Sequence, residues 1–159
     1  MRLVVGLTLA AHGFQKLFGW FGGRGPEGTG RSFEAMGFLP GRLFALVAGA
    51  CEAAGGLFLA AGFLVPLAAA TVAGTMLSAA LSVHLKNGFF LSKNGWEYTF
   101  VIAGVAVGLA FTGPGVYSLD HAVGWTLSGP AWGAGAIAVA LVAGLTTDAY
   151  RRHALAEAS

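Results

Sequence analysis

A single acidic residue, Glu52, interrupts an apolar run that extends from about Leu43 to about Val65. At about 1.5 Å rise per residue, a helix of this length is about 30 Å long, which matches the hydrocarbon thickness of a bilayer. Glu52 would then lie near the middle of the membrane, where an ionised side chain costs at least about 2.5–3.5 kcal/mol. This carboxylate therefore requires either a proton or a polar partner from another segment.

The residues around Glu52 are small, which allows neighbouring helices to approach closely. They are Ala50, Ala53, Ala54, Gly55 and Gly56. Only 10% of the chain is charged, against about 25% in soluble domains. We therefore predict a single all-α integral membrane domain over residues 1–159. The expected architecture is a transmembrane helical bundle with a four-helix core and a fifth, C-terminal helix.

Five apolar runs define the predicted spans, at about residues 3–20, 43–65, 66–86, 96–112 and 131–147. Pro66 favours a helix start directly after the second run, so the second and third spans should be antiparallel neighbours. Residues 21–40 are rich in glycine and proline, which break regular structure. Within them we expect only a short turn near residues 32–36, capped by Ser32. This segment is either a lid over a site or a mobile connector.

Two spacing patterns predict contacts between helices. Gly104 and Gly108 form a pair of small residues four apart, which is typical of close helix crossings in membranes. A stripe of hydroxyl side chains follows one face of the third span. It consists of Thr71, Thr75, Ser78 and Ser82.

Alternation of the spans places the loops after the first and third spans on one side of the membrane. Four further ionisable residues then share that half of the membrane with Glu52. They are His12, Lys16, His84 and Glu97. A buried carboxylate and a nearby cation stabilise each other's charged forms, and such groups can share or relay a proton. We expect Glu52, His12 and Glu97 to act in catalysis, with Lys16 and His84 binding the ligand.

A quinone head group suits such a set, because it accepts hydrogen bonds at its oxygens and takes up protons on reduction. Five aromatic residues are expected to supply apolar walls for its ring: Phe14, Phe18, Phe44, Phe89 and Trp96. The alternatives are a haem between His12 and His84, or a metal held by the His and Glu side chains. A structural alternative is a protonated Glu52 that only hydrogen-bonds a neighbouring helix. The lone Cys51 excludes an intramolecular disulfide and is expected to pack inertly.

The basic residues lie at the ends of the apolar runs, so they indicate contact with membrane lipid and give no support for nucleic-acid binding. With five spans, all Lys and Arg residues except Arg2 fall on the side of the long loops and the C-terminus. The positive-inside rule then predicts a multi-pass protein whose long loops are cytoplasmic.

Four stretches together resemble the DoxX family of small integral membrane proteins. They are residues 12–17 (HGFQKL), residues 49–57 (GACEAAGGL), His84 with residues 95–97 (GWE), and residues 113–120 (GPGVYSLD). The resemblance covers about residues 2–120 and places the family's polar positions on His12, Lys16, Glu52, Glu97 and Asp120. The last apolar run, residues 131–147, extends beyond the family pattern.

The resemblance implies a bacterial inner-membrane bundle of about four helices with a role near redox metabolism. Family members are associated with quinone-linked thiosulfate oxidation, with resistance to quinones and catechols, and with membrane complexes of soluble redox enzymes. Three functions remain open from the sequence. The first is a quinone-binding protein, alone or as the membrane subunit of an oxidoreductase. The others are an anchor that recruits soluble redox proteins at the cytoplasmic face, and a proton-coupled transporter.

Overall fold

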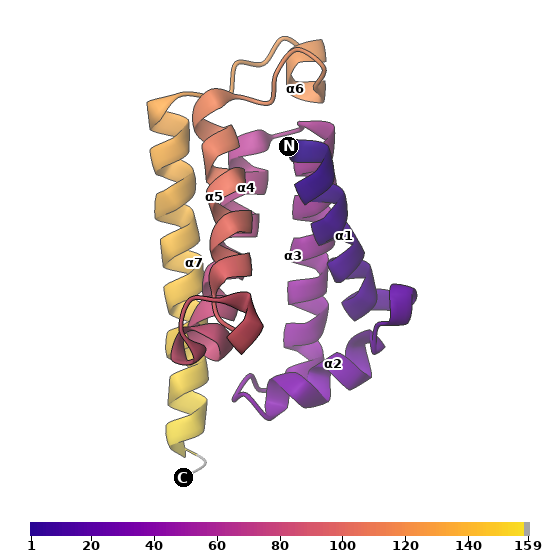
Figure 1. Ribbon diagram of the computed structural model, residues 1–159, viewed down its shortest axis with the longest axis vertical. Coiled ribbons are helices and arrows are strands. Elements are labelled where there is room, and N and C mark those ends of the chain that lie inside the picture. Colours follow the sequence, from indigo (N-terminus) through magenta and orange to yellow (C-terminus); the bar gives the residue numbers. More distant parts are fainter. Residues whose placement is uncertain (158–159) are drawn as a thin grey trace.

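The computed structural model describes residues 1–157 and consists of helices joined by short connections (Figure 1). The five long helices are α1 (Arg2–Phe18), α3 (Gly41–Ala61), α4 (Val65–Ala79), α5 (Glu97–Thr112) and α7 (Pro130–Glu157). Two shorter helices are α2 (Gly25–Glu34) and α6 (Leu119–Ala122). No β-strand occurs within residues 1–157. The prediction of an all-α helical bundle with an additional C-terminal helix is confirmed.

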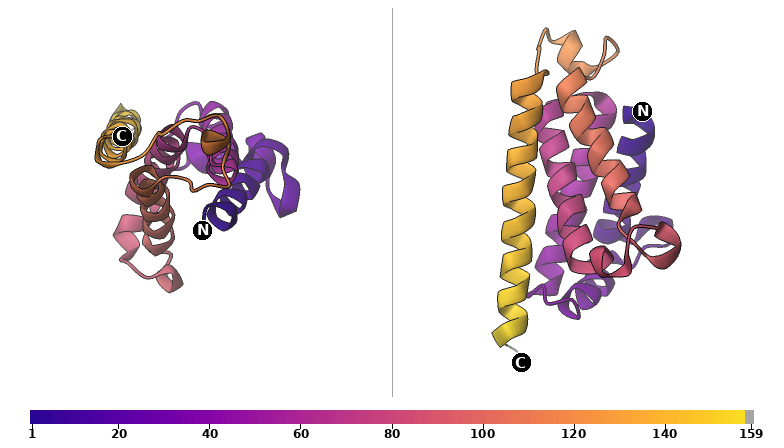
Figure 2. Two further views of the ribbon diagram at one scale, coloured as in Figure 1. Left: turned by 90° about the horizontal axis from the view of Figure 1, so that it is seen from above. Right: turned by 60° about the vertical axis from the view of Figure 1, so that its left-hand side comes forward.

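The two ends of the bundle differ in what they carry (Figures 1 and 2). One end, which we call the α2 end, holds α2, the connection between α4 and α5, and the C-terminal part of α7. The opposite end, the α6 end, holds the N-terminus, the α3–α4 turn and α6. The two long connections, α2 and the segment between α4 and α5, therefore lie at the same end, as the alternation of spans predicted.

The outside of the bundle is apolar. α3, α7 and the continuous helical segment Val65–Asn87 are long and apolar enough to cross a membrane, and α5 is a shorter apolar helix. Their outward surfaces expose large side chains that include Leu43, Leu67, Phe100 and Val142. Such an extended apolar exterior suits contact with lipid rather than water. The fold is a transmembrane helical bundle.

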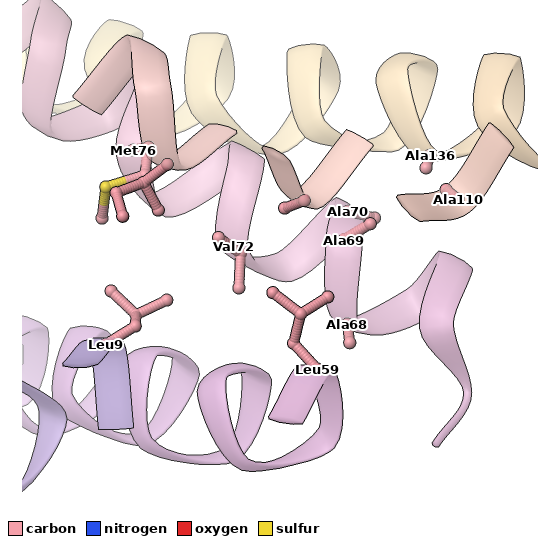
Figure 3. Close-up of a cluster of buried hydrophobic side chains, with 11 residues drawn as sticks. Leu9, Leu59, Ala68, Ala69, Ala70, Val72, Met76, Ala110 and Ala136 are labelled. Atoms are coloured by element: carbon pink, nitrogen blue, oxygen red, sulfur yellow. The ribbon is translucent and has the colours of Figure 1, made fainter. Parts of the chain in front are cut away.

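The core is built from small and branched side chains between the helices. Leu9 of α1 and Leu59 of α3 point across to Val72 of α4 (Figure 3). Alanines from α4, α5 and α7 close the opposite side of α4, where Ala106, Ala110 and Ala136 are fully or almost fully buried. α4 therefore lies at the centre of the bundle, packed against α3, α5 and α7.

Glycines bring α1 and α3 into backbone contact. A Cβ atom at Gly6 would lie 2.6 Å from the backbone nitrogen of Ala60. A Cβ atom at Gly13 would lie 2.6 Å from the carbonyl oxygen of Gly49 and would also meet the backbone of Ala53. These distances leave no space for side chains, so the crossing depends on glycine. The close approach at Gly13 aligns the following turn of α1 with the acidic part of α3.

Replacing Gly13 by alanine is expected to lower the free energy of unfolding by about 1–3 kcal/mol, because the new methyl group forces two backbones apart. The measurement is thermal unfolding of the purified protein in detergent. Gly104→Ala is the matched control, since a Cβ at Gly104 meets nothing within 4 Å. That control should gain up to about 1 kcal/mol from helix propensity. Equal melting of both variants would contradict the glycine crossing.

The predicted helix contact through Gly104 and Gly108 is wrong within this chain. A Cβ at either position would meet no atom of the described residues within 4 Å. α5 instead packs through Ile102, Ala106 and Ala110, which lie on its buried face. Spacing alone identified a small-residue pair, but the buried face of the helix is set by its alanines and isoleucine.

The expectation that most of residues 21–40 are irregular is also wrong. α2 begins at Gly25, contains Pro26 in its first turn, and ends at Glu34. Ser32 does not cap this helix, because its hydroxyl donates to the Gly28 carbonyl one turn earlier at 3.3 Å. A Cβ at Gly30 would lie 2.9 Å from the backbone nitrogen of Arg42. The glycine-rich composition therefore serves a close contact between α2 and the start of α3.

Asp120 fixes the α3–α4 turn at the α6 end. The carboxylate is fully buried, and it accepts hydrogen bonds from the backbone nitrogens of Leu64 at 2.8 Å and Val65 at 3.1 Å. Leu64 has a positive φ of 46°, which is unfavourable for a branched side chain. Asp120 therefore satisfies the free N–H groups at the start of α4 and stabilises a strained turn. Its role is structural and distant from the other polar residues singled out in the sequence.

Candidate functional site

A cavity of about 560 Å³ lies among α1, α3, α4, α5 and α7. Most of its wall is apolar, and its polar residues come from separate helices. The ionisable and hydroxyl-bearing residues that line it include His12, Lys16, Cys51, Glu52, His84 and Tyr98. Its volume falls within the range of about 300–1,000 Å³ that is usual for small-molecule sites.

The polar end of the cavity is centred on an ion pair between Lys16 of α1 and Glu52 of α3. The Lys16 ammonium group donates directly to Oε2 of Glu52. The side chains are only 22% and 8% exposed, so the pair is largely shielded. The glycine crossing of α1 and α3 brings these residues together. Glu52 thus obtains the polar partner that its position in an apolar helix requires.

His12 lies on the same helix as Lys16, one turn earlier, and also lines the cavity. Its Nδ1 lies 3.1 Å from Oε1 of Gln15, whose amide group donates to the Phe21 carbonyl. The amide oxygen therefore accepts from Nδ1–H, which leaves Nε2 to accept or donate a proton. An imidazole beside a carboxylate–ammonium pair is an arrangement that can exchange protons with a bound molecule.

Tyr98 of α5 completes the polar end and was not anticipated from the sequence. Its ring contacts His12 edge to face, with centroids 6.0 Å apart. The hydroxyl oxygen is buried and has no hydrogen-bond partner within residues 1–157. Buried hydroxyl groups without a partner are costly and rare. A tyrosine at the border of an apolar run reads as an interfacial anchor, so the sequence alone gave no signal for this role.

α4 contributes the hydroxyl stripe, and the structure places all four of its members at the cavity. Three of these hydroxyls donate to carbonyls of their own helix: Thr71 to Leu67, Thr75 to Thr71, and Ser82 to Ser78, at 2.7–2.9 Å. Beyond Ala79, α4 continues as a π-helical turn, Ala80–His84. Such turns are uncommon and often occur at functional sites. His84 lines the cavity and donates from Nδ1 to the Asn94 carbonyl at 2.9 Å.

Glu97 is not among the described residues that line the cavity. Its carboxylate accepts a hydrogen bond from the backbone nitrogen of Leu91 at 2.8 Å and so orders the α4–α5 connection. Neighbouring helix positions differ by about 100°, so Tyr98 faces the site while Glu97 does not. The structure thus brings His12, Lys16, His84 and Glu52 to one cavity and separates Glu97 from them.

Of the five aromatic residues expected as walls, Phe44 lines the cavity and the other four lie elsewhere. Phe14 and Phe18 pack with Trp20 at centroid distances of 5.5 Å and 5.0 Å, and Phe18 is 57% exposed. Trp96 packs on Phe89 at 4.9 Å at the start of α5. None of these four lines the cavity within the described chain. Both clusters suit anchoring at a membrane interface.

The geometry offers little to a metal ion. Within residues 1–157, no group of three or more His, Cys, Asp or Glu side chains is arranged to hold one. His84 and Glu97 are each engaged by the α4–α5 connection, and Glu52 by Lys16. The ligand set of His12, Glu52, His84 and Glu97 that the sequence left open is therefore not assembled.

The α1–α4 part of the chain, with the Lys16–Glu52 pair and His12, can be compared with known proteins. Residues 1–85 match the family model described as DoxX. The chain belongs to the DoxX family. This DoxX protein is 37% identical over 103 residues to the inner membrane protein YqjF of Escherichia coli (strain K12). The alignment covers 65% of this chain and 78% of that protein. No solved structure matches the chain.

The matched segment ends at the π-helical turn, so the DoxX match contains most but not all of the site. His12, Lys16, Glu52 and His84 lie inside it. Tyr98 on α5, and the cavity wall contributed by α7, lie outside it. The site of this DoxX protein therefore combines the matched helices with helices beyond the match.

Proposed function

We propose that this DoxX protein binds a quinone or a similar lipid-soluble electron carrier in the cavity, alone or as the membrane subunit of an oxidoreductase. The observation that carries the proposal is the polar end of the cavity. There the largely shielded Lys16–Glu52 pair, His12 and Tyr98 line an otherwise apolar cavity, and the buried Tyr98 hydroxyl has no hydrogen-bond partner within residues 1–157. A quinone offers carbonyl oxygens to such donors and an apolar ring to the remaining wall.

The residues have distinct roles in this proposal. The Tyr98 hydroxyl donates a hydrogen bond to one quinone oxygen, which gives that buried group the partner it lacks within residues 1–157. His12 exchanges protons with the reacting oxygen. The ion pair sets the local field and returns protons to His12. Electrons come from a redox partner, and the chain supplies binding, orientation and protons.

The test measures binding of ubiquinone and menaquinone analogues to the protein in lipid nanodiscs. Quenching of the protein's tryptophan fluorescence reports the binding. We expect Glu52→Gln and His12→Ala to weaken binding by about tenfold or more, because hydrogen bonds to charged groups contribute about 1.5–3 kcal/mol. Tyr98→Phe should weaken binding by about threefold to tenfold, as expected for one neutral hydrogen bond.

Glu27→Gln on α2 is the matched control, because Glu27 is an exposed acid outside the cavity that should leave binding unchanged. Each variant is first checked for native helical content and a single elution peak. Tyr98→Phe has a second use. It removes a hydroxyl that has no partner in residues 1–157, so the empty protein should be at least as stable as wild type. A wild-type protein that binds neither quinone, or full binding by Glu52→Gln, would reject the proposal.

We further propose that the α2 end faces the cytoplasm. The alternative function is an anchor that recruits soluble redox proteins at this end. Lys and Arg residues gather at that end, in agreement with the positive-inside rule. Arg42 hydrogen-bonds Glu27 at 2.7 Å, and this contact lowers the pKa of Glu27 below its usual value. Charge reversal of Arg24 and Arg31 should abolish co-purification of soluble redox proteins if the anchoring role is correct. Glu52→Gln should leave that co-purification intact.

A further inference from the structure

The cavity also opens sideways, between α3 and α7. Val47 of α3 and Val139 of α7 both line the cavity, yet they are 50% and 55% exposed. Ala143 of α7 lines the same part of the wall and is also exposed. Residues that border a cavity and also lie at the molecular surface mark an opening. This opening lies within the apolar stretches of two candidate membrane spans, so it faces lipid acyl chains.

α4 forms the floor between the two walls. It packs against α3 on one side and against α7 on the other (Figure 2). The contact with α7 is close, because a Cβ at Gly74 would lie 3.4 Å from Cβ of Ala143. The hydroxyl groups of Thr71 and Thr75 donate to carbonyls of their own helix at 2.9 Å. A hydroxyl satisfied in this way requires no hydrogen bond from a ligand, so the floor accepts an apolar chain.

Aromatic side chains pack across the α2 end of the cavity. Phe38, which is 5% exposed, packs on Phe44 at 5.2 Å, and Phe44 packs on Tyr150 of α7 at 5.5 Å. The Tyr150 hydroxyl donates to the Leu39 carbonyl at 2.6 Å. Arg151 lies over the Phe38 ring, 6.0 Å from its centroid. These contacts fasten the α2–α3 connection to α7, whereas Val47 and Val139 stay exposed on the membrane side.

We propose that the ligand of this site is amphipathic and carries a long apolar tail that leaves between α3 and α7 into the bilayer. The inference rests on the proposed function and adds that the quinone is an isoprenoid-tailed one held by its head group. The head occupies the polar end at Lys16, Glu52 and Tyr98. The tail follows the floor of α4 and passes between Val47 and Val139.

The experiment compares two probes in nanodiscs of phosphatidylethanolamine and phosphatidylglycerol. One is a quinone with a long isoprenoid tail, and the other has the same head group with a methyl group in place of the tail. Concentrations are expressed as mole fraction in lipid. Because the tail passes from one apolar medium to another, wild-type protein should bind both probes with affinities within about threefold.

Val139→Trp narrows the opening from α7, and Val47→Trp narrows it from α3. We expect each substitution to lower the affinity for the long-tailed quinone by about tenfold. The affinity for the tail-less quinone should change by less than about twofold. The control is Val142→Trp on α7, which makes the same change at a residue that is 65% exposed and does not line the described cavity. It should change neither affinity.

The outcomes separate this inference from the proposed function. The lateral opening is overturned if the opening variants lower the affinity for both probes equally, or if they leave the affinity for the long-tailed probe unchanged. Quinone binding stands in either case. Failure of wild-type protein to bind either probe overturns the proposed function and this inference with it. Selective loss of the long-tailed probe in both opening variants supports both.

Discussion

Replacing Lys16 by methionine is expected to lower the free energy of unfolding by about 3–5 kcal/mol, the usual cost of removing one partner from a buried ion pair. Glu52 remains buried in the middle of α3, and its carboxylate loses the ammonium group from which it accepts a hydrogen bond. Methionine keeps most of the side-chain volume, so loss of packing contributes little. The measurement is thermal and denaturant unfolding of the purified protein in detergent.

Two further variants identify the cause of that loss. Lys16→Met combined with Glu52→Gln should recover part of the stability, because the pair is then replaced by neutral groups. Lys93→Met changes an exposed lysine in the α4–α5 connection and should change stability by less than about 0.5 kcal/mol. If Lys16→Met melts together with Lys93→Met, the ion pair has no structural role.

Removing the Asp120 side chain should be almost as costly. Asp120→Ala leaves the backbone N–H groups of Leu64 and Val65 without their acceptor, at a buried position. Each unsatisfied group costs about 1–3 kcal/mol, so we expect a loss of about 2–6 kcal/mol for the two groups together. Thermal unfolding measures the total loss, and hydrogen exchange at Leu64 and Val65 locates it.

Asp120→Asn is the graded comparison, because an amide retains one acceptor oxygen and should lose about half as much stability. Quinone binding is the independent readout. Asp120 lies at the α6 end and does not line the described cavity. Folded Asp120→Asn protein should therefore bind quinone like wild type. A selective loss of binding with unchanged stability would assign this residue to the site instead of to the turn.

The fold was predictable to the extent that it depends on apolar length. One carboxylate in a long apolar run, together with prolines at helix starts, indicated a membrane bundle without any tertiary information. The sequence did not predict α2, because its glycines are required by a close contact with another helix, α3. Gly30 meets the backbone of Arg42, and no local pattern reports such a contact. The predicted helix contact through Gly104 and Gly108 was wrong for the converse reason. The spacing of small residues does not show which face of a helix is buried.

The site was partly predictable on the same terms. Alternation of the spans placed His12 and Lys16 in the same half of the membrane as Glu52, and the need of Glu52 for a polar partner pointed to them. The sequence placed Glu97 at the site, whereas Tyr98 lines the cavity. Topology fixes the depth of a residue in the membrane but not its angle around the helix. Only the packing of α5 against α4 and α7 turns Tyr98 inward.

The order of the two paired helices also matters for biosynthesis. Lys16 precedes Glu52 by thirty-six positions, so the helix with the cation leaves the ribosome first. An acidic helix released alone into lipid would bear the cost of an isolated charge, at least about 2.5–3.5 kcal/mol on insertion scales. We expect α3 to insert beside α1, which carries its counter-charge and the glycines of the α1–α3 crossing. Chain order thus makes the lysine available before the acidic span that needs it.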